Sequence, residues 1–186
     1  MTVYLVTSLH RSGSSMMMRG LIAGGMQGVY GADQDWLNVS HGRPGYQPNP
    51  HGFYAMDDAS EFARPDFAEE YAGKLVKLPP GMALRLPPGD YRVVFMQRAP
   101  AQILASMATM QPYSLFGTEP AIWFYAKVRD AMILAMQARG AVVDVVKYAD
   151  VIASPVAVFT ALQSAGWPIN PALSAAVVDP ALYRSV

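Results

Sequence analysis

The chain has 186 residues, no cysteine, and 14 basic side chains against 14 acidic ones, so its formal net charge is zero. This length suits one domain with a sizeable core, and a neutral charge excludes a protein that coats nucleic acid with a strongly basic surface. The lack of cysteine excludes disulfides and thiol catalysis, and three separated histidines (10, 41 and 51) argue against a zinc site. We expect a single domain over residues 1–186 whose anion sites are built locally.

The first apolar segment, residues 2–6, is too short for the hydrophobic core of a signal peptide, and no basic stretch precedes it. No stretch of the chain reaches the ~18 apolar residues that a membrane-spanning helix needs. The sequence therefore predicts a cytoplasmic protein with no membrane span and with small or soluble molecules as its partners.

Predicted strands and helices alternate along the chain. Short apolar runs predict strands at 3–6, 74–78, 91–97 and 141–148. Apolar residues at helical spacing, with capping residues and glycine stops, predict helices at 14–23, at 57–72 with a bend or restart at Pro65, at 100–110, at 118–139, and between an N-cap at Ser154 and Gly166. Residues 30–49 predict a long loop, and a short helical turn lies between the two Leu-Pro-Pro-Gly segments. This alternation predicts a three-layer α/β/α domain with a central parallel sheet, whose ligands bind beyond the carboxyl ends of the strands.

The segment Thr7-Ser-Leu-His-Arg-Ser-Gly-Ser-Ser-Met16 joins the first predicted strand to the first predicted helix. A Ser- and Gly-rich turn at this point exposes several backbone N–H groups at the positive end of a helix, which accommodates phosphate or sulfate. Gly13 permits close approach of the anion, while Ser12, Ser14 and Ser15 supply hydroxyl groups. We predict an anion-binding loop here; the alternative is an ordinary Ser/Gly helix start.

This loop departs from the nucleotide-binding pattern G-x-x-x-x-G-K-[ST]. With Gly13 as the second glycine, Ser8 replaces the first glycine and Ser14 replaces the lysine that reaches the β- and γ-phosphates. Ser15 matches the last position, and a basic residue, Arg11, precedes the glycine by two positions. The pattern disfavours an ATP or GTP hydrolase but keeps an anion cradle.

A second predicted strand, turn and helix occupies residues 93–106. Arg98 follows the strand, and Ser106 lies about two helical turns further on. Because the carboxyl ends of parallel strands share one edge, Arg98 and Arg11 should converge there. A guanidinium and a hydroxyl suit a second phosphate, although Arg98 would equally serve as a structural cap or ion-pair partner.

Together the two segments resemble the PAPS-dependent sulfotransferases, particularly the compact bacterial members. The first loop of that family reads H-R-S-G-[ST]-S and binds the 5'-phosphosulfate of 3'-phosphoadenosine-5'-phosphosulfate (PAPS), which implies Arg11 as its basic residue and Ser12, Gly13, Ser14 and Ser15 as its cradle. The R-x-P-x5-S element that grips the 3'-phosphate corresponds to Arg98, Pro100 and Ser106. The resemblance implies a P-loop NTPase-like sulfotransferase fold, PAPS as donor, 3',5'-ADP (PAP) as product, and no metal.

Three further stretches look similar to the same family, in the same order. Residues 49–54 resemble its N-x-x-G-[FY]-[FWY]-E segment, residues 146–155 its Y-E-D-L-x-x-x-P element, and residues 178–184 its carboxyl-terminal end. The chain departs from the pattern at Ala55 and Ala149, where the family has glutamate. The anion sites thus match the family better than the acid–base residues do.

Sulfuryl transfer needs positive charge on the leaving phosphate, expected from Arg11 and the loop amides, and a base for the proton of a hydroxyl acceptor. Arg11 stands where many members have lysine, and arginine does not readily donate a proton. In the family, the base is commonly a Glu, Asp or His after the first loop. The candidates that we rank first are Asp33, His51 and Asp57, ahead of Asp35, His41 and Asp58.

Three functions remain open. The first is a sulfotransferase that uses PAPS and a hydroxyl or amine acceptor. The second is a degenerate sulfotransferase-like domain that binds nucleotide without turnover, which Ala55 and Ala149 favour. The third is a P-loop kinase, which the missing lysine opposes. We expect Met16–Met18 and residues 123–125 to lie mostly in the core, and Lys77 to be solvated at a strand edge rather than aimed at the donor site.

Overall fold

The computed structural model describes residues 1–32, 49–79, 81–108 and 119–182. Within these residues, five strands form one parallel sheet in the order β2-β3-β1-β4-β5. Their bounds are β1 Val3–Ser8, β2 Gly28–Val29, β3 Leu75–Lys77, β4 Tyr91–Gln97 and β5 Val142–Lys147. The predicted α/β class and central parallel sheet are confirmed.

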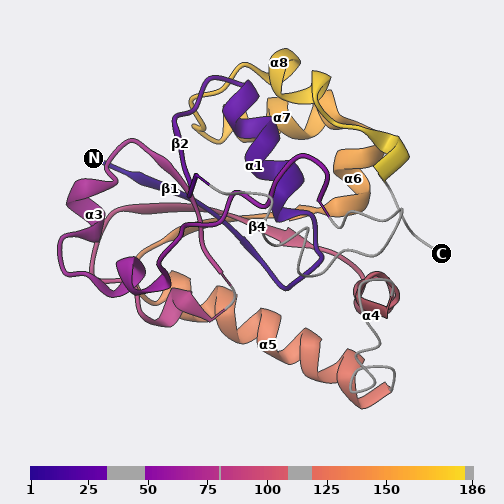
Figure 1. Cartoon of the computed structure of the whole chain (residues 1–186), viewed down its shortest axis with the longest axis horizontal. Coiled ribbons are helices and arrows are strands. Elements are labelled where there is room, and N and C mark those ends of the chain that lie inside the picture. The colour runs from indigo at the N-terminus through magenta and orange to yellow at the C-terminus, as the bar shows by residue number, and fades with distance from the viewer. Residues whose placement is uncertain (33–48, 80, 109–118, 183–186) are drawn as a thin grey trace.

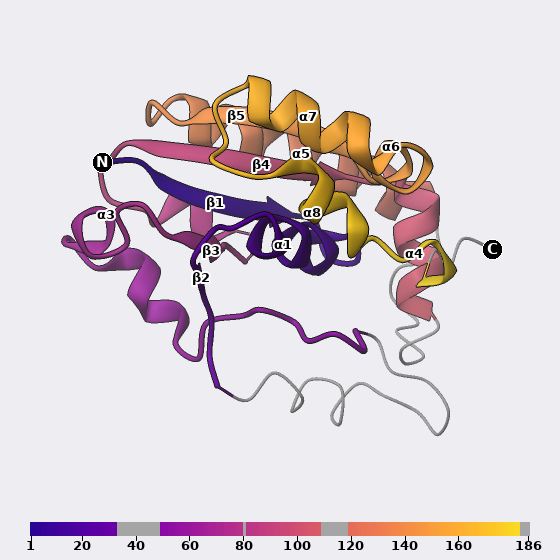
Figure 2. The same ribbon diagram turned by 90° about the horizontal axis from the view of Figure 1, so that it is seen from above.

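Helices cover both faces of the sheet and make three layers (Figures 1 and 2). One face carries α1 (Ser14–Ala23), α7 (Pro155–Ser164) and α8 (Pro171–Ala176), and the other carries α5 (Glu119–Gln137). The shorter described helices are α3 Phe67–Glu70, α4 Pro100–Ala108, α6 Tyr148–Ala153 and the 3-10 turns Ala59–Ala63, Met82–Leu84 and Pro180–Leu182. None of the helices in the described part of the chain is long and apolar enough to cross a membrane.

The period-two alternation of strand β1 divides the core between the two faces. Val3 and Leu5 pack into a cluster that includes Met132 of α5, whereas Val6 packs into a cluster with Leu21 of α1 and Phe159 of α7. All six side chains are buried. Because β1 has a neighbour on each side, the loop that follows it is flanked by the carboxyl ends of β3 and β4.

The restart predicted at Pro65 is confirmed, but the helical segments on either side of it are shorter than the predicted range of 57–72. The chain forms a 3-10 turn over Ala59–Ala63 and a single helical turn over Phe67–Glu70 instead. Arg64 lies between them in extended backbone (φ −66°, ψ 135°) because the ring of the following Pro65 disfavours a helical conformation. The proline therefore separates two short turns rather than bending one helix.

Several other boundaries differ from the prediction by one or two residues: β1 ends at Ser8 rather than at residue 6, β3 spans Leu75–Lys77 rather than 74–78, and α5 spans Glu119–Gln137 rather than 118–139. The strand predicted at 141–148 ends at Lys147, and Tyr148 begins α6. Ser154 precedes α7 as predicted, but its side chain makes no capping hydrogen bond; its backbone N–H bonds to Asp150 O at 2.8 Å. The predicted helix 14–23 and strand 91–97 are confirmed at both ends. Helix α4 begins at Pro100 as predicted, and its predicted end at Met110 lies outside the described residues.

Candidate functional site

The loop between β1 and α1 has left-handed backbone (positive φ) at two positions, and it is strained at one of them, Arg11. Gly13 is the N-cap of α1 with φ 92°, and no side chain caps the helix. Arg11 has φ 62°, which a residue with a side chain adopts only when its surroundings enforce it. The uncapped first turn of α1 leaves backbone N–H groups available to an anion.

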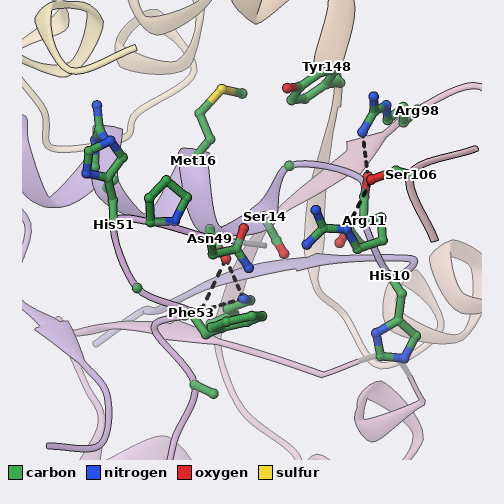
Figure 3. Close-up of a pocket in the computed structure, with 18 of the residues that line it drawn as sticks. His10, Arg11, Ser14, Met16, Asn49, His51, Phe53, Arg98, Ser106 and Tyr148 are labelled. Carbon is green, nitrogen blue, oxygen red and sulfur yellow. Dashed lines mark hydrogen bonds between the residues drawn. The ribbon is translucent and has the colours of Figure 1, made fainter. Parts of the chain in front are cut away.

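A cavity of about 420 Å³ opens beside this loop, at the carboxyl edge of the sheet. Its wall comes from the loop and the start of α1, from residues 49–55, from the end of β3, from the β4–α4 region, and from the start of α6. Figure 3 shows Arg11, Arg98 and Ser106 gathered on one side of the site and His51 on the other. The structure thus joins segments that are far apart in the sequence.

The two predicted arginines meet as expected. Arg11 Nε donates to Ser106 Oγ at 3.1 Å, and Arg98 Nη1 donates to Arg11 O at 3.0 Å. The guanidinium of Arg98 also lies over the ring of Tyr148, 4.6 Å from its centroid. Arg98 is buried, and this set of contacts fixes two cations at one end of the cavity.

Tyr148 also explains why the loop needs glycine at position 13. A Cβ at Gly13 would lie 2.4 Å from Tyr148 Cδ2, well inside van der Waals contact. Gly13, Ser14 and Ser15 line the cavity as the sequence predicts. Ser12 does not line it: this side chain is 1% exposed, and its Oγ has no hydrogen-bond partner in the described structure.

Lys77, at the end of β3, is a site residue that the sequence analysis assigned wrongly to a solvated strand edge. Its Nζ donates to Ser15 Oγ at 2.9 Å and to the backbone carbonyl of Phe53, and it lines the cavity. Burial, and then the guanidinium of Arg11, lower the pKa of Lys77 to about 7. The place of Lys77 at the carboxyl end of a buried strand was the available signal, because β3 pairs with β1 beside the loop.

The predicted bases lie in different places. His51 lines the cavity. Asp57 is exposed and lies against Gly31, away from the cavity wall, while Asp58 accepts hydrogen bonds from Ser60 N and Ser60 Oγ, both at 2.7 Å. The remaining predicted bases, Asp33, Asp35 and His41, lie outside the described residues.

The cavity wall also contains residues that the sequence analysis did not assign to a site. Arg19 of α1 donates to the carbonyl of Val177, and both residues line the cavity together with Asp179. His10 lines it too, and desolvation followed by the charges of Lys77 and Arg11 lowers the pKa of His10. Among the residues that the structure describes, no group of three or more His, Asp or Glu side chains is placed to hold a metal ion.

Comparison with known protein families found no matching family, and comparison with curated proteins found no match either. Among solved structures, the chain is similar to the sulfotransferase STF1 from Mycobacterium tuberculosis H37Rv, with a TM-score of 0.51 and 16% sequence identity. The similarity covers 95% of this chain and 71% of that chain. The chain therefore has a sulfotransferase-like fold.

Proposed function

We propose that the chain is a sulfotransferase that moves a sulfuryl group from PAPS to a hydroxyl or amine of an acceptor. The observation that carries this proposal is a pair of cationic groups on either side of one anion loop. Arg98 and Arg11 lie with Ser106 on the β4 side of the loop (the arginine end), and Lys77 lies against Ser15 on the β3 side (the lysine end). A donor with two separate phosphate groups on one nucleoside matches this arrangement.

The residues of the protein that would bind the donor fall into two groups, one for each of its phosphates. We assign the 5'-phosphosulfate to the first turn of α1, to Gly13 and to the hydroxyls of Ser14 and Ser15, which line the cavity. We assign the 3'-phosphate to Arg98 and Ser106, with Arg11 as the residue that bonds to Ser106. The sequence predicts that Arg11 neutralises the leaving 5'-phosphate. Because Arg11 Nε bonds to Ser106 Oγ and Lys77 Nζ bonds to Ser15 Oγ, we propose that Lys77 also supplies positive charge to that phosphate.

In the transfer, the bond from sulfur to the bridging phosphate oxygen breaks as a bond from sulfur to the acceptor oxygen forms. The ammonium of Lys77 beside Ser15 stabilises the charge that develops on the leaving phosphate. The acceptor's proton passes to a base, and His51 is the predicted base that the described structure places at the cavity. Such a base contributes about 10²–10⁴-fold to the rate.

Calorimetric titration with 3',5'-ADP, and with ATP with and without Mg²⁺, tests the donor assignment. We expect 3',5'-ADP to bind without a metal and to raise the melting temperature. Stabilisation by Mg-ATP alone would refute the proposal and favour a kinase. Turnover is then measured as release of 3',5'-ADP from PAPS with a panel of acceptors, and we expect His51→Gln to lower kcat without changing the affinity for 3',5'-ADP.

One observation favours a second candidate, a nucleotide-binding domain without turnover. Ala55 lines the cavity at the position where the family pattern has glutamate. This candidate predicts that 3',5'-ADP binds with the affinity expected of an active enzyme. It also predicts that no acceptor in the panel causes release of 3',5'-ADP from PAPS.

A further inference from the structure

We propose that residues 49–55 form a strap whose Phe53 carbonyl occupies the place of an anion oxygen at Lys77 and Ser15, and that a bound anion displaces it. This inference rests on the proposed function and adds a form of regulation to the same site. In the absence of an anion, the strap holds the cation of the β3 end in place. When the donor binds, the Phe53 carbonyl of the strap no longer accepts the hydrogen bond from Lys77.

The contacts of the Phe53 carbonyl are those that a phosphate or sulfate oxygen would make. It accepts a hydrogen bond from Ser15 Oγ at 3.3 Å and another from Lys77 Nζ, while Lys77 Nζ also donates to Ser15 Oγ at 2.9 Å. One oxygen thus receives a hydroxyl of the anion loop and an ammonium from the neighbouring strand. Figure 3 shows Phe53 in this position within the site.

The carbonyl is a poor electrostatic match for this lysine. In the described part of the chain, no ion pair includes Lys77, and its Nζ donates hydrogen bonds to the neutral oxygens of Phe53 and Ser15. Burial and the charge of Arg11 lower the pKa of Lys77 to about 7, which shows that its positive charge is insufficiently compensated. An anionic oxygen makes a stronger, charge-assisted hydrogen bond to an ammonium than a carbonyl does. A bound anion should therefore displace the Phe53 carbonyl from Lys77.

The backbone of the strap is strained where it would have to move. Tyr54, directly after the carbonyl, has φ 54°, which is unusual for a bulky residue, and Gly52 before it has φ 90°. The far end of the strap is anchored, because Gly31 N donates to Ala55 O at 2.8 Å and the ring of Tyr54 meets that of Tyr30 edge-on at 5.2 Å. Release of Phe53 would let the backbone of Tyr54 return to a relaxed conformation while the hydrogen bond between Gly31 N and Ala55 O holds the far end of the strap.

The sequence offers a direct probe of the carbonyl. Labelling the carbonyl carbon of phenylalanine and the nitrogen of tyrosine gives an NMR signal only for Phe-Tyr peptide bonds, of which the chain has two, Phe53-Tyr54 and Phe124-Tyr125. The second bond lies in α5 and serves as an internal reference. A carbonyl shift responds to the hydrogen bonds that the oxygen accepts, so the Phe53-Tyr54 signal reports whether the strap is held.

We expect saturating 3',5'-ADP, and separately inorganic sulfate, to move the Phe53-Tyr54 signal and to leave the Phe124-Tyr125 signal in place. Lys77→Met should move the same signal in the same direction without any ligand, and the ligand should then move it much less. Lys74→Met removes a lysine near the other end of β3 and is the matched control; it should leave both the signal and its response to ligand unchanged.

The outcomes separate the strap from the proposed function. Binding of 3',5'-ADP by calorimetry with a stationary Phe53-Tyr54 signal would overturn the strap and keep the function. If no nucleotide binds, the function fails, and sulfate decides the strap: a signal that moves supports it, and a signal that stays at the highest sulfate concentration overturns it. The ligand experiments use the wild-type protein, so they decide the question even if Lys77→Met fails to fold.

Discussion

The two ends of the cavity hold their cations in different ways. At one end, Arg98 bonds to the backbone of Arg11 and packs on the ring of Tyr148, and Arg11 bonds to Ser106. At the other end, Lys77 donates hydrogen bonds to Ser15 Oγ and to the Phe53 carbonyl, which directly precedes the strained residue Tyr54. The arginine end is prepared for a phosphate before it arrives, whereas we propose that the lysine end must exchange a partner. One site can thus combine a fixed anchor, at the arginine end, with a contact that depends on the ligand, at the lysine end.

Gly13→Ala should have the largest effect, because it disturbs both ends at once. A Cβ at Gly13 would overlap the ring of Tyr148 at 2.4 Å, and its φ of 92° disfavours any side chain. We expect a loss of about 1–3 kcal/mol in the free energy of unfolding from backbone strain, a further loss from the overlap, and no measurable nucleotide binding. Chemical denaturation and calorimetry measure both.

The matched control for this variant is Gly140→Ala. Gly140 has a similar φ of 85°, but a Cβ there would meet nothing within 4 Å. Gly140→Ala should therefore lose only the free energy of unfolding that backbone strain costs, and it should bind nucleotide normally. Equal loss of binding in both variants would mean that the contact with Tyr148 does not shape the site.

Arg98→Ala should affect the fixed end alone. The variant lacks a charged hydrogen-bonding partner of the 3'-phosphate. Its affinity for 3',5'-ADP should therefore fall by about 10- to 100-fold, and its affinity for 5'-AMP, which lacks that phosphate, should stay nearly unchanged. Calorimetric titration with the two nucleotides measures the ratio. Arg92→Ala, which removes an arginine near the amino end of the same strand, should leave the ratio unchanged. Equal weakening of both nucleotides by Arg98→Ala would contradict the assignment.

Lys77→Met should have a smaller effect on affinity, because the variant also loses the competing strap. We expect the affinities for 3',5'-ADP and for 5'-AMP both to fall by about 10-fold, since both nucleotides carry the 5'-phosphate. The ordinary pKa of lysine is 10.5 and that of Lys77 is about 7, so at pH 8 the amine is mostly neutral and an arriving anion raises its pKa. Binding should therefore take up a proton in the wild type, and not in Lys77→Met.

This proton uptake is measured by calorimetry in two buffers with different ionisation enthalpies. It should disappear at pH 5.5, where Lys77 is already charged before the anion arrives. Uptake at pH 8 that persists in Lys77→Met would assign the proton to another group, and His10, whose pKa is lowered by its surroundings, would be the next to test.

Asp58→Ala should have the smallest effect and none on the cavity. Asp58 accepts from Ser60 N and caps the 3-10 turn that follows, so its loss should lower the free energy of unfolding only slightly. Nucleotide affinity should stay the same at both ends. A change in affinity would bring this carboxylate back as a functional residue.

The arginine end could be predicted from the sequence, and the lysine end could not. Arg11 and Arg98 each follow a recognisable strand, so the carboxyl-edge rule alone brings them together. The role of Lys77 depends on β3 lying next to β1 and on a side chain that reaches back to Ser15, and neither fact is written in the local pattern. Residues 57–72 show a related limit locally: the sequence predicts the restart at Pro65, but not that only short helical turns form on either side of it.

The contacts of the site join residues that are distant along the chain. Lys77 and Ser15 are 62 positions apart, Arg98 and Arg11 87, and Arg11 and Ser106 95. We expect such contacts to form late in folding, because each requires the closure of a long loop before it stabilises the chain. A partly folded chain in which β3 or β4 has not joined β1 therefore has no complete site. A ligand that binds here should slow global unfolding of the sheet, and its binding can serve as an assay for chains that have completed their folding.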